Sequence, residues 1–347
     1  MRIALTGLPF SGKSTVFKAL AGKKTQPKTS ASGKIQLNLG TLELRDERLE
    51  KLARILNSEK ITYPKLILVD LAYSGGAGPE TIETGHLREF DALAVVIGVF
   101  LRQDPMKDLA DIEAELILGD MQLIQNRIEK INKEKKAHPA KEEDLQLVLL
   151  KRCQKALEEE TLPRDLKLTP QELKMLAGFQ LLTLKPVIMV ANISEEQLSR
   201  KEWVDLEKKA EAKNLKFLSL CAKLEAEIEE LPEKERLGFL KQYGLAGLSR
   251  DRFIEICFQA QDQILFFTVV GREARAWPVL RGTTALGAAG CVHSDMERGF
   301  IRAEAINYRD FVECGSMALA REKGLLRLES KEYPVQDGDI INFKFSV

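Results

Sequence analysis

The sequence predicts an α/β protein with a mainly parallel sheet, an inserted pair of helices and a small α+β domain at its C-terminus. Three observations lead to this fold class. Short apolar runs, as at residues 3–6 and 66–70, alternate with helical segments and are typical of buried parallel strands. Between residues 104 and 182, apolar side chains recur at helical spacing instead. From residue 264 onward the pattern changes to short strands and turns.

The amino-acid composition indicates which kinds of binding partner and which cellular compartment to expect. A chain of 347 residues is long enough for two or three domains, each with its own core. Its 52 basic and 52 acidic residues cancel, so no strong signal for nucleic-acid binding is present. The longest apolar run, residues 92–101, is too short to span a bilayer, and no signal peptide precedes the first strand, so no membrane partner is expected. Five scattered cysteines argue against disulfides or a zinc site and suit a cytoplasmic protein.

Residues 7–14 fit the pattern G-x-x-x-x-G-K-[ST] between a predicted strand at 3–6 and a predicted helix at 15–20. Glycines let backbone N–H groups turn toward a phosphate, and the start of a helix adds partial positive charge. Lys13 can reach the β- and γ-phosphates, and the Ser14 hydroxyl can ligate Mg²⁺. The motif therefore predicts a nucleoside triphosphate site. The residues of this motif predicted to bind nucleotide are Gly7, Pro9, Phe10, Ser11, Gly12, Lys13, Ser14 and Thr15.

The apolar run at residues 66–70 ends in Asp70. An Asp at this strand end of a P-loop enzyme holds Mg²⁺ beside the hydroxyl of the phosphate loop. Ser14 and Asp70 are therefore the predicted Mg²⁺ ligands, and Lys13 and Asp70 the predicted catalytic residues. An Asp that only caps a turn is the alternative.

The polar stretch at residues 23–40 shows no clear period. In a P-loop protein a phosphate-sensing segment would lie here, and an ordinary surface loop is the equal alternative. The candidate Mg²⁺ hydroxyls of this stretch are Thr25, Thr29, Ser30 and Ser32. An amphipathic helix is predicted next, at residues 45–56.

Residues 106–136 and 142–160 predict an antiparallel helical hairpin that reverses at residues 138–140. Its charged faces are explained most simply by solvation, and a partner-docking arm is the alternative. The other predicted strands are 92–100, 186–192, 217–220, 265–269, 276–279 and 340–345, and the other predicted helices are 222–230, 251–263 and 284–291. The predicted domains are a nucleotide-binding domain at 1–103 and 183–263, the insertion at 104–182 and a C-terminal domain at 264–347.

Together these residues resemble the YchF/Obg-like ATPase family, P-loop NTPases of the translation-factor class. The likeness covers almost the whole chain. Residues 115–120 look like the start of the family's helical insertion. Residues 275–277, 281–284, 293–304 and 335–339 look like its β-grasp-like TGS domain. The resemblance implies a slow Mg²⁺-dependent ATPase, with GTP as a competing substrate, linked to the ribosome, translation or stress regulation.

The base-reading loop bears on the choice of nucleotide. A guanine site in this class normally has Asn-Lys-x-Asp, and residues 192–195 here are Asn-Ile-Ser-Glu. By the resemblance, Asn192 and Glu195 read the base and Ile193 replaces the lysine stem. Cys221, Ala222 and Lys223 match the loop whose backbone N–H groups approach the base edge. Adenine is favoured, with guanine as the competitor. A helix-start carboxylate is the structural alternative for Glu195.

Three departures from the family pattern bear on hydrolysis. Tyr73 stands where the family has a Gly that meets the γ-phosphate, although Gly75 or Gly76 can take that role after a rearrangement. Phe10 replaces an Asn that helps to hold potassium in related GTPases. A histidine that the family often carries corresponds to Val95.

The nearby His86 is a possible substitute for that histidine, and a helix-surface role is its alternative. A nucleotide-binding switch or scaffold with little or no hydrolysis is therefore the second functional hypothesis. Direct RNA binding through the C-terminal domain is a third, and the mixed charge of that domain weakens it.

Overall fold

The computed structural model describes residues 1–22, 25–29, 35–73, 84–101, 104–135, 141–200 and 203–346. The chain divides into two compact units. The first comprises Met1–Thr41 and Ile67–Arg250, and the second comprises Leu42–Leu66 and Asp251–Val347. No helix in the described ranges has the length and apolar character needed to cross a bilayer.

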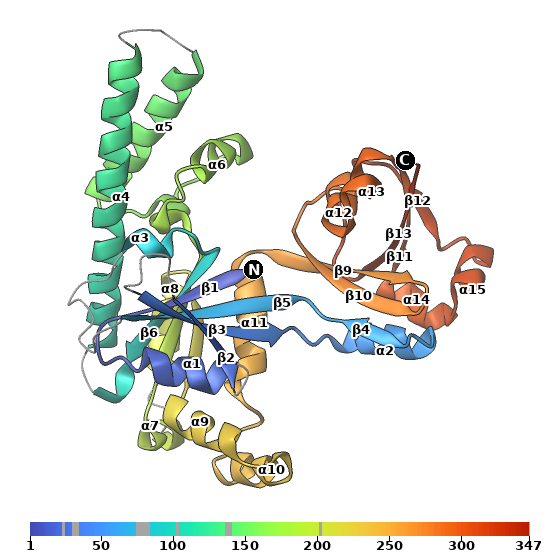
Figure 1. The fold of residues 1–347 in the computed structure, drawn as a ribbon, viewed down its shortest axis with the longest axis horizontal. Helices are drawn as coiled ribbons and strands as arrows, with labels where there is room; N and C mark the ends of the chain where they lie inside the picture. The colour runs from blue at the N-terminus through green and yellow to red at the C-terminus, as the bar shows by residue number, and fades with distance from the viewer. Residues whose placement is uncertain are drawn as a thin grey trace. The chain divides into compact units, whose positions relative to one another are not determined.

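The first unit is built on a sheet with the strand order β2-β3-β5-β1-β6-β7-β8 (Figure 1). The strands are β1 (Arg2–Thr6), β2 (Thr25–Thr29), β3 (Ile35–Glu43), β5 (Lys65–Tyr73), β6 (Ala92–Gly98), β7 (Val187–Asn192) and β8 (Lys216–Leu220). β5, β1, β6, β7 and β8 pair in parallel, and the inner strands β6 and β7 are buried at every position. Strands covered on both faces require such continuous apolar runs. The predicted fold class is confirmed.

One part of this sheet differs from the sequence prediction. β2 and β3 form an antiparallel pair in which Thr25 lies opposite Gly40, whereas the sequence predicts a phosphate-sensing segment or an ordinary surface loop at residues 23–40 and no strand pair. Strand pairing supplies the backbone hydrogen bonds here, so the pair needs no apolar period of its own. Ser30 and Ser32, two of the candidate hydroxyls, lie outside the described residues.

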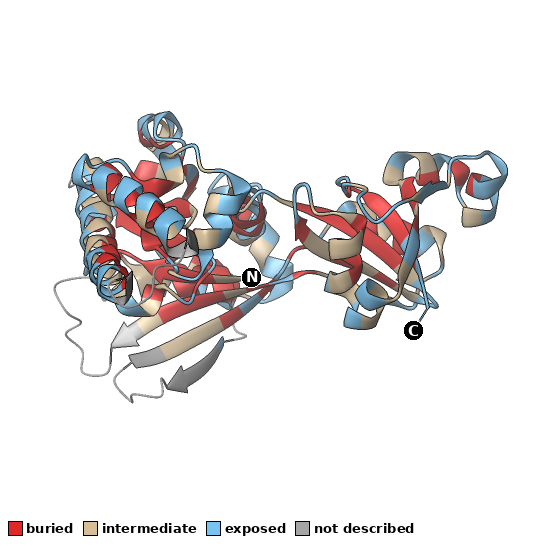
Figure 2. Cartoon of the chain, turned by 90° about the horizontal axis from the view of Figure 1, so that it is seen from above, coloured by how far each residue is buried: buried red, intermediate tan, exposed pale blue. Residues whose placement is uncertain are grey.

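Helices surround the sheet of the first unit. They are α1 (Lys13–Ala21), α3 (Thr84–Leu87), α4 (Pro105–Lys135), α5 (Lys141–Glu158), α6 (Pro170–Ala177), α7 (Glu195–Arg200), α8 (Val204–Ala212), α9 (Ala222–Glu230) and α10 (Glu233–Gln242), and α11 (Ser249–Ala260) leads into the second unit. Figure 2 shows buried residues concentrated along the strands, with exposed residues on the outer faces of the helices.

Helix α4 belongs to two hydrophobic cores. Near its start, Leu109, Ile112 and Leu116 pack into the core beside the sheet of the first unit. Further along, Ile124 and Ile131 pack against α5 in a separate, smaller core. The first part of α4 therefore attaches the inserted helices to the sheet. Further from the sheet, α4 and α5 are stabilised by packing against each other (Figure 1). The turn predicted at residues 138–140 lies outside the described residues.

The second unit is a sheet with the strand order β12-β11-β13-β9-β10-β4. Its strands are β4 (Lys60–Thr62), β9 (Gln263–Val270), β10 (Glu273–Leu280), β11 (Phe300–Asn307), β12 (Arg327–Glu329) and β13 (Asp339–Phe345). Its helices are α2 (Glu47–Ile55), α12 (Ala285–Val292), α13 (Ser294–Arg298), α14 (Tyr308–Cys314) and α15 (Met317–Glu322). This is a small α+β unit, and its identity as a TGS domain stays a prediction.

The segment Leu42–Leu66 lies in the second unit, whereas the sequence analysis had included it in the nucleotide-binding domain. β4 pairs in parallel with β10, with Lys60 opposite Glu273. The Arg48 guanidinium on α2 donates to the Asp337 carboxylate at 2.7 Å. Local periodicity detects a helix such as α2, but it carries no information about a pairing partner more than 200 residues away.

Candidate functional site

The phosphate loop lies at the carboxyl end of the central strand β1 and runs into α1. Gly7 and Gly12 have φ angles of 150° and 85°. A Cβ atom on Gly7 would lie 2.4 Å from the Val96 carbonyl oxygen, and one on Gly12 would lie 2.3 Å from Asn192 Nδ2. Glycine is required at Gly7 because the Val96 backbone approaches it, and at Gly12 because the buried Asn192 side chain approaches it. The loop therefore has the local geometry predicted from its sequence pattern.

The Lys13 side chain folds back over this loop. Its Nζ donates to the Gly7 and Leu8 carbonyl oxygens, both at 2.9 Å. Burial lowers the pKa of Lys13, and the negative charge of Asp70 partly opposes that shift. The site thus holds a partly desolvated cation, an arrangement in which an anionic ligand interacts more strongly than it would in bulk water.

Ser14 and Asp70 are neighbours in the structure. Ser14 Oγ donates to Asp70 Oδ2 at 3.1 Å, and Asn38 Nδ2 donates to the same oxygen at 3.2 Å. The Asp70 residue is only 1% exposed. A hydroxyl beside a carboxylate is the hard oxygen donor set that Mg²⁺ prefers, so the residues present fit this ion.

Asn38 was not among the residues predicted from the sequence. It lies on β3, next to β5 in the sheet, whereas Thr25 and Thr29 lie on β2, one strand further away. The strand order therefore brings Asn38 beside Asp70, while β2, which carries the two threonines, is the next strand outward. The only signal in the sequence is the position of Asn38 in the polar stretch before Gly40. Tyr73 ends β5, and Gly75 and Gly76 lie outside the described residues.

Asn192 connects the phosphate loop to the second loop of the site. Its side chain is buried at the end of β7, where Nδ2 donates to the Ser11 carbonyl oxygen at 3.1 Å. Its Oδ1 accepts a hydrogen bond from the backbone N–H of Ala222 at 3.2 Å. Both Nδ2 and Oδ1 of the Asn192 amide are therefore hydrogen-bonded to backbone groups of the protein. This geometry favours a positioning role for Asn192, which differs from the base-reading role expected from the sequence.

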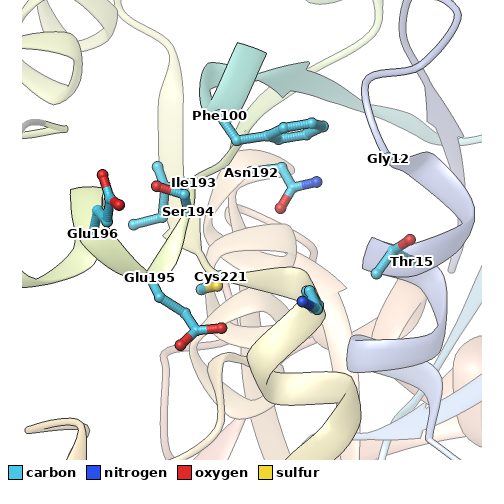
Figure 3. Close-up of a pocket in the computed structure, with 10 residues that line it drawn as sticks. Gly12, Thr15, Phe100, Asn192, Ile193, Ser194, Glu195, Glu196 and Cys221 are labelled. Atoms are coloured by element: carbon cyan, nitrogen blue, oxygen red, sulfur yellow. The ribbon is translucent and has the colours of Figure 1, made fainter. Parts of the chain in front are cut away.

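A cavity of about 700 Å³ lies between these loops (Figure 3). Of the predicted residues, it is lined by Gly12, Thr15, Asn192, Ile193, Glu195, Cys221 and Lys223. Sequence reasoning missed three lining residues, which are Phe100, Ser194 and Glu196. Phe100 follows the carboxyl end of β6, the same sheet edge that carries Asp70 and Asn192, and this position in the strand order was a signal that could have identified it. Pro9 and Phe10 lie at the exposed tip of the phosphate loop.

The backbone conformation of Phe10 is expected to lower the stability of the folded protein, and this can be tested. Its φ angle is 65°, in the left-handed region, and the residue is 88% exposed. An L-residue there costs about 1–2 kcal/mol, and asparagine tolerates this conformation better than phenylalanine does. Phe10→Asn is therefore expected to raise the free energy of unfolding by about 1 kcal/mol, measured by urea denaturation at an unchanged m-value.

Phe10→Val serves as the control, since a β-branched side chain suits a positive φ poorly. It is expected to lower the free energy of unfolding. If the asparagine variant were instead less stable than the parent protein, the strain assigned to Phe10 would be wrong.

The strand–loop–helix cradle and the second loop around one cavity define a P-loop nucleotide-binding protein. The chain is 34% identical to "Ribosome-binding ATPase YchF" of Bacillus subtilis, with 99% of this chain and 98% of that protein covered. It is 35% identical to the protein of the same name from Mycoplasma genitalium, again with 99% and 98% covered. The chain therefore belongs to the YchF family, and the resemblance found in the sequence is confirmed.

Two further comparisons agree with this assignment. The sequence profile YchF-GTPase_C, described as "Protein of unknown function (DUF933)", matches residues 263–346. The solved structure of the Schizosaccharomyces pombe YchF GTPase matches with a TM-score of 0.80 at 22% identity, covering 99% of this chain and 97% of that one. A GTP-binding protein from Pyrococcus horikoshii matches with a TM-score of 0.61 at 17% identity, covering both chains in full. At these identities the structural matches support the fold.

Proposed function

We propose that this protein binds ATP with Mg²⁺ and hydrolyses it slowly, with GTP as a competing nucleotide. The observation that carries the proposal is the convergence of Lys13, the Ser14–Asp70 pair and the cavity at one edge of the sheet. The names of the curated relatives support an ATPase that binds the ribosome. A ribosomal partner and a cytoplasmic location are proposed on that basis.

The phosphates would lie against the loop formed by residues 7–14, where backbone N–H groups and Lys13 supply positive charge. Ser14 and Asp70 would hold Mg²⁺, which would neutralise charge that develops on the transferred phosphoryl group. Asn38 donates to Asp70 Oδ2 and fixes the orientation of this carboxylate. Catalysis at such a site is mainly positioning and electrostatic stabilisation.

The cavity has the groups needed to hold a purine. Phe100 and Ile193 offer apolar surface, and Glu195 offers an exposed carboxylate that can accept a hydrogen bond from an exocyclic amino group. Cys221 and Lys223, at the start of α9, also line the cavity. Both purines can donate to a carboxylate, adenine through N6 and guanine through N1 and N2, so the preference for ATP is a point for direct measurement.

A nucleotide-binding switch with little hydrolysis is the second candidate function. Val95 stands where the family often carries a histidine, and it is fully buried in β6. Tyr73 ends β5 where the family has glycine. Both observations reduce the groups available to activate water and leave the phosphate loop intact.

Titration of nucleotide-free protein with ATP and with GTP, each with Mg²⁺, tests the proposal when product is followed in the same samples. ATP binding with steady formation of ADP is the expected result. ATP binding without turnover would select the switch function, and a clear preference for GTP would overturn the adenine assignment. If neither nucleotide bound, the proposed function would be wrong.

A further inference from the structure

A buried ion pair ties the helical insertion to the nucleotide-binding sheet. Arg88 Nη1 donates to Asp120 Oδ1 at 2.6 Å, and the two side chains are 15% and 0% exposed. The other oxygen of Asp120 accepts hydrogen bonds from Thr183 N at 2.8 Å and Thr183 Oγ1 at 2.7 Å. Asp120 lies in the middle of α4, and Thr183 lies on the segment by which the chain returns to β7. One carboxylate in the middle of α4 therefore binds both Arg88 and the segment that follows the insertion.

The guanidinium of Arg88 makes two further contacts with the insertion. Nη2 donates to the Gly119 carbonyl oxygen at 2.9 Å, and Nη1 donates to the Gln180 carbonyl oxygen at 3.2 Å. A Cβ atom on Gly119 would lie 2.8 Å from Thr84 Oγ1, so α3 packs closely against α4 at this glycine (Figure 1). These contacts fix α3 and the residue that follows it against the middle of α4.

Arg88 lies on the connection between β5, which carries Asp70, and β6, the strand that leads to Phe100. By contrast, a second shielded ion pair near the start of α4 joins Glu113 to Arg164 at 2.6 Å, with side chains that are 13% and 14% exposed. This pair links α4 to the segment before α6 and not to Arg88. The cluster formed by Arg88, Asp120 and Thr183 thus lies near the amino ends of β6 and β7, and the connection on which Arg88 lies begins at the carboxyl end of β5, the edge that carries Asp70.

We propose that this cluster transmits the state of the nucleotide site to the helical insertion, so that the triphosphate and diphosphate forms give the helices beyond Asp120 different local stabilities. The inference rests on the proposed nucleotide binding and adds the regulation of that site. A buried charge pair suits the task because breaking it leaves an uncompensated charge, which favours discrete arrangements over gradual ones. By thermodynamic linkage, if bound nucleotide changes the stability of the helices, a change in the stability of the helices also changes the affinity for nucleotide.

Hydrogen–deuterium exchange on the full chain tests the proposal, with Mg²⁺ and either ADP or a non-hydrolysable ATP analogue. Amides of residues 121–135 and 144–158 are expected to exchange at rates that differ by about fivefold or more between the two nucleotides. In the double variant Arg88→Gln/Asp120→Asn, this difference is expected to fall below about twofold. The paired substitution keeps a hydrogen-bonded pair and leaves no buried charge, so the fold should be retained.

The matched control is the double variant Glu113→Gln/Arg164→Gln, which removes the other shielded ion pair and should keep the nucleotide-dependent difference. If the Arg88 and Asp120 double variant fails to fold, Arg88→Lys replaces it, because lysine keeps the charge and loses the forked contacts. An equal exchange rate with both nucleotides in the parent protein, or a difference that survives in the Arg88 variants, overturns the coupling alone. Absence of nucleotide binding in the same samples overturns the proposed function as well, so the two failures are distinguishable.

Discussion

Lys13→Met is expected to weaken the binding of ATP with Mg²⁺ by about 10- to 150-fold while leaving the protein folded. A hydrogen bond from a charged donor contributes about 1.5–3 kcal/mol, and each 1.4 kcal/mol is a factor of ten in affinity. Methionine keeps much of the volume of the lysine stem and removes the cation. Burial lowers the pKa of Lys13, which means that the free protein holds this charge at a cost. Its removal relieves that cost and offsets the two lost hydrogen bonds to the Gly7 and Leu8 carbonyl oxygens.

The Lys13→Met variant should therefore lose affinity for ATP without a matching loss of folding stability. Calorimetric titration with ATP and Mg²⁺ measures the first, and urea denaturation without nucleotide measures the second. Lys18→Met is the matched control, since Lys18 is an exposed lysine of the same helix α1 and is expected to change neither quantity. Binding within about threefold of the parent value in Lys13→Met would mean that the phosphates lie somewhere other than this loop.

The sequence predicted those parts of the site that local chemistry determines. The spacing of Gly7, Gly12 and Lys13 requires a loop with backbone at positive φ, and the structure has that loop. Asp70 could be predicted because an apolar run that leads into a carboxylate indicates a buried strand, although β5 continues beyond Asp70 to Tyr73. Helix α9 begins and ends at the predicted residues because its apolar period and its flanking positions agree.

What the sequence did not predict depends on contacts between distant segments. Asn38 reaches Asp70 only because β3 lies next to β5, and no local pattern gives that strand order. Similarly, the pairing of β4 with β10 removes Leu42–Leu66 from the first unit. Strand register and side-chain hydrogen bonds arise after the chain has folded, so periodicity within a window of 10 to 20 residues contains neither.

Asn192 is the position at which the sequence hypothesis and the structure lead to different experimental results. If its amide positions the loops, Asn192→Ala leaves the Ser11 carbonyl and the Ala222 N–H buried without their partner. Each such group costs about 1–3 kcal/mol, so the variant should lose about 2–6 kcal/mol of stability and bind ATP at least about 30-fold more weakly. Gln197→Ala is the matched control, because Gln197 is also a buried amide with bonds to two segments, at Val99 and Ser194, but it does not touch the phosphate loop.

Tripolyphosphate with Mg²⁺, which has phosphates and no base, separates the two roles of Asn192. A positioning residue acts on the phosphate loop itself, so Asn192→Ala should weaken tripolyphosphate and ATP by similar factors. A residue that only reads the base would leave tripolyphosphate binding unchanged and weaken ATP alone. The first pattern is expected, because the hydrogen bond from Asn192 Nδ2 ends on Ser11, within the phosphate loop. For Gln197→Ala any loss of affinity should be confined to ATP, since this side chain supports Ser194 in the wall of the cavity and makes no contact with residues 7–14.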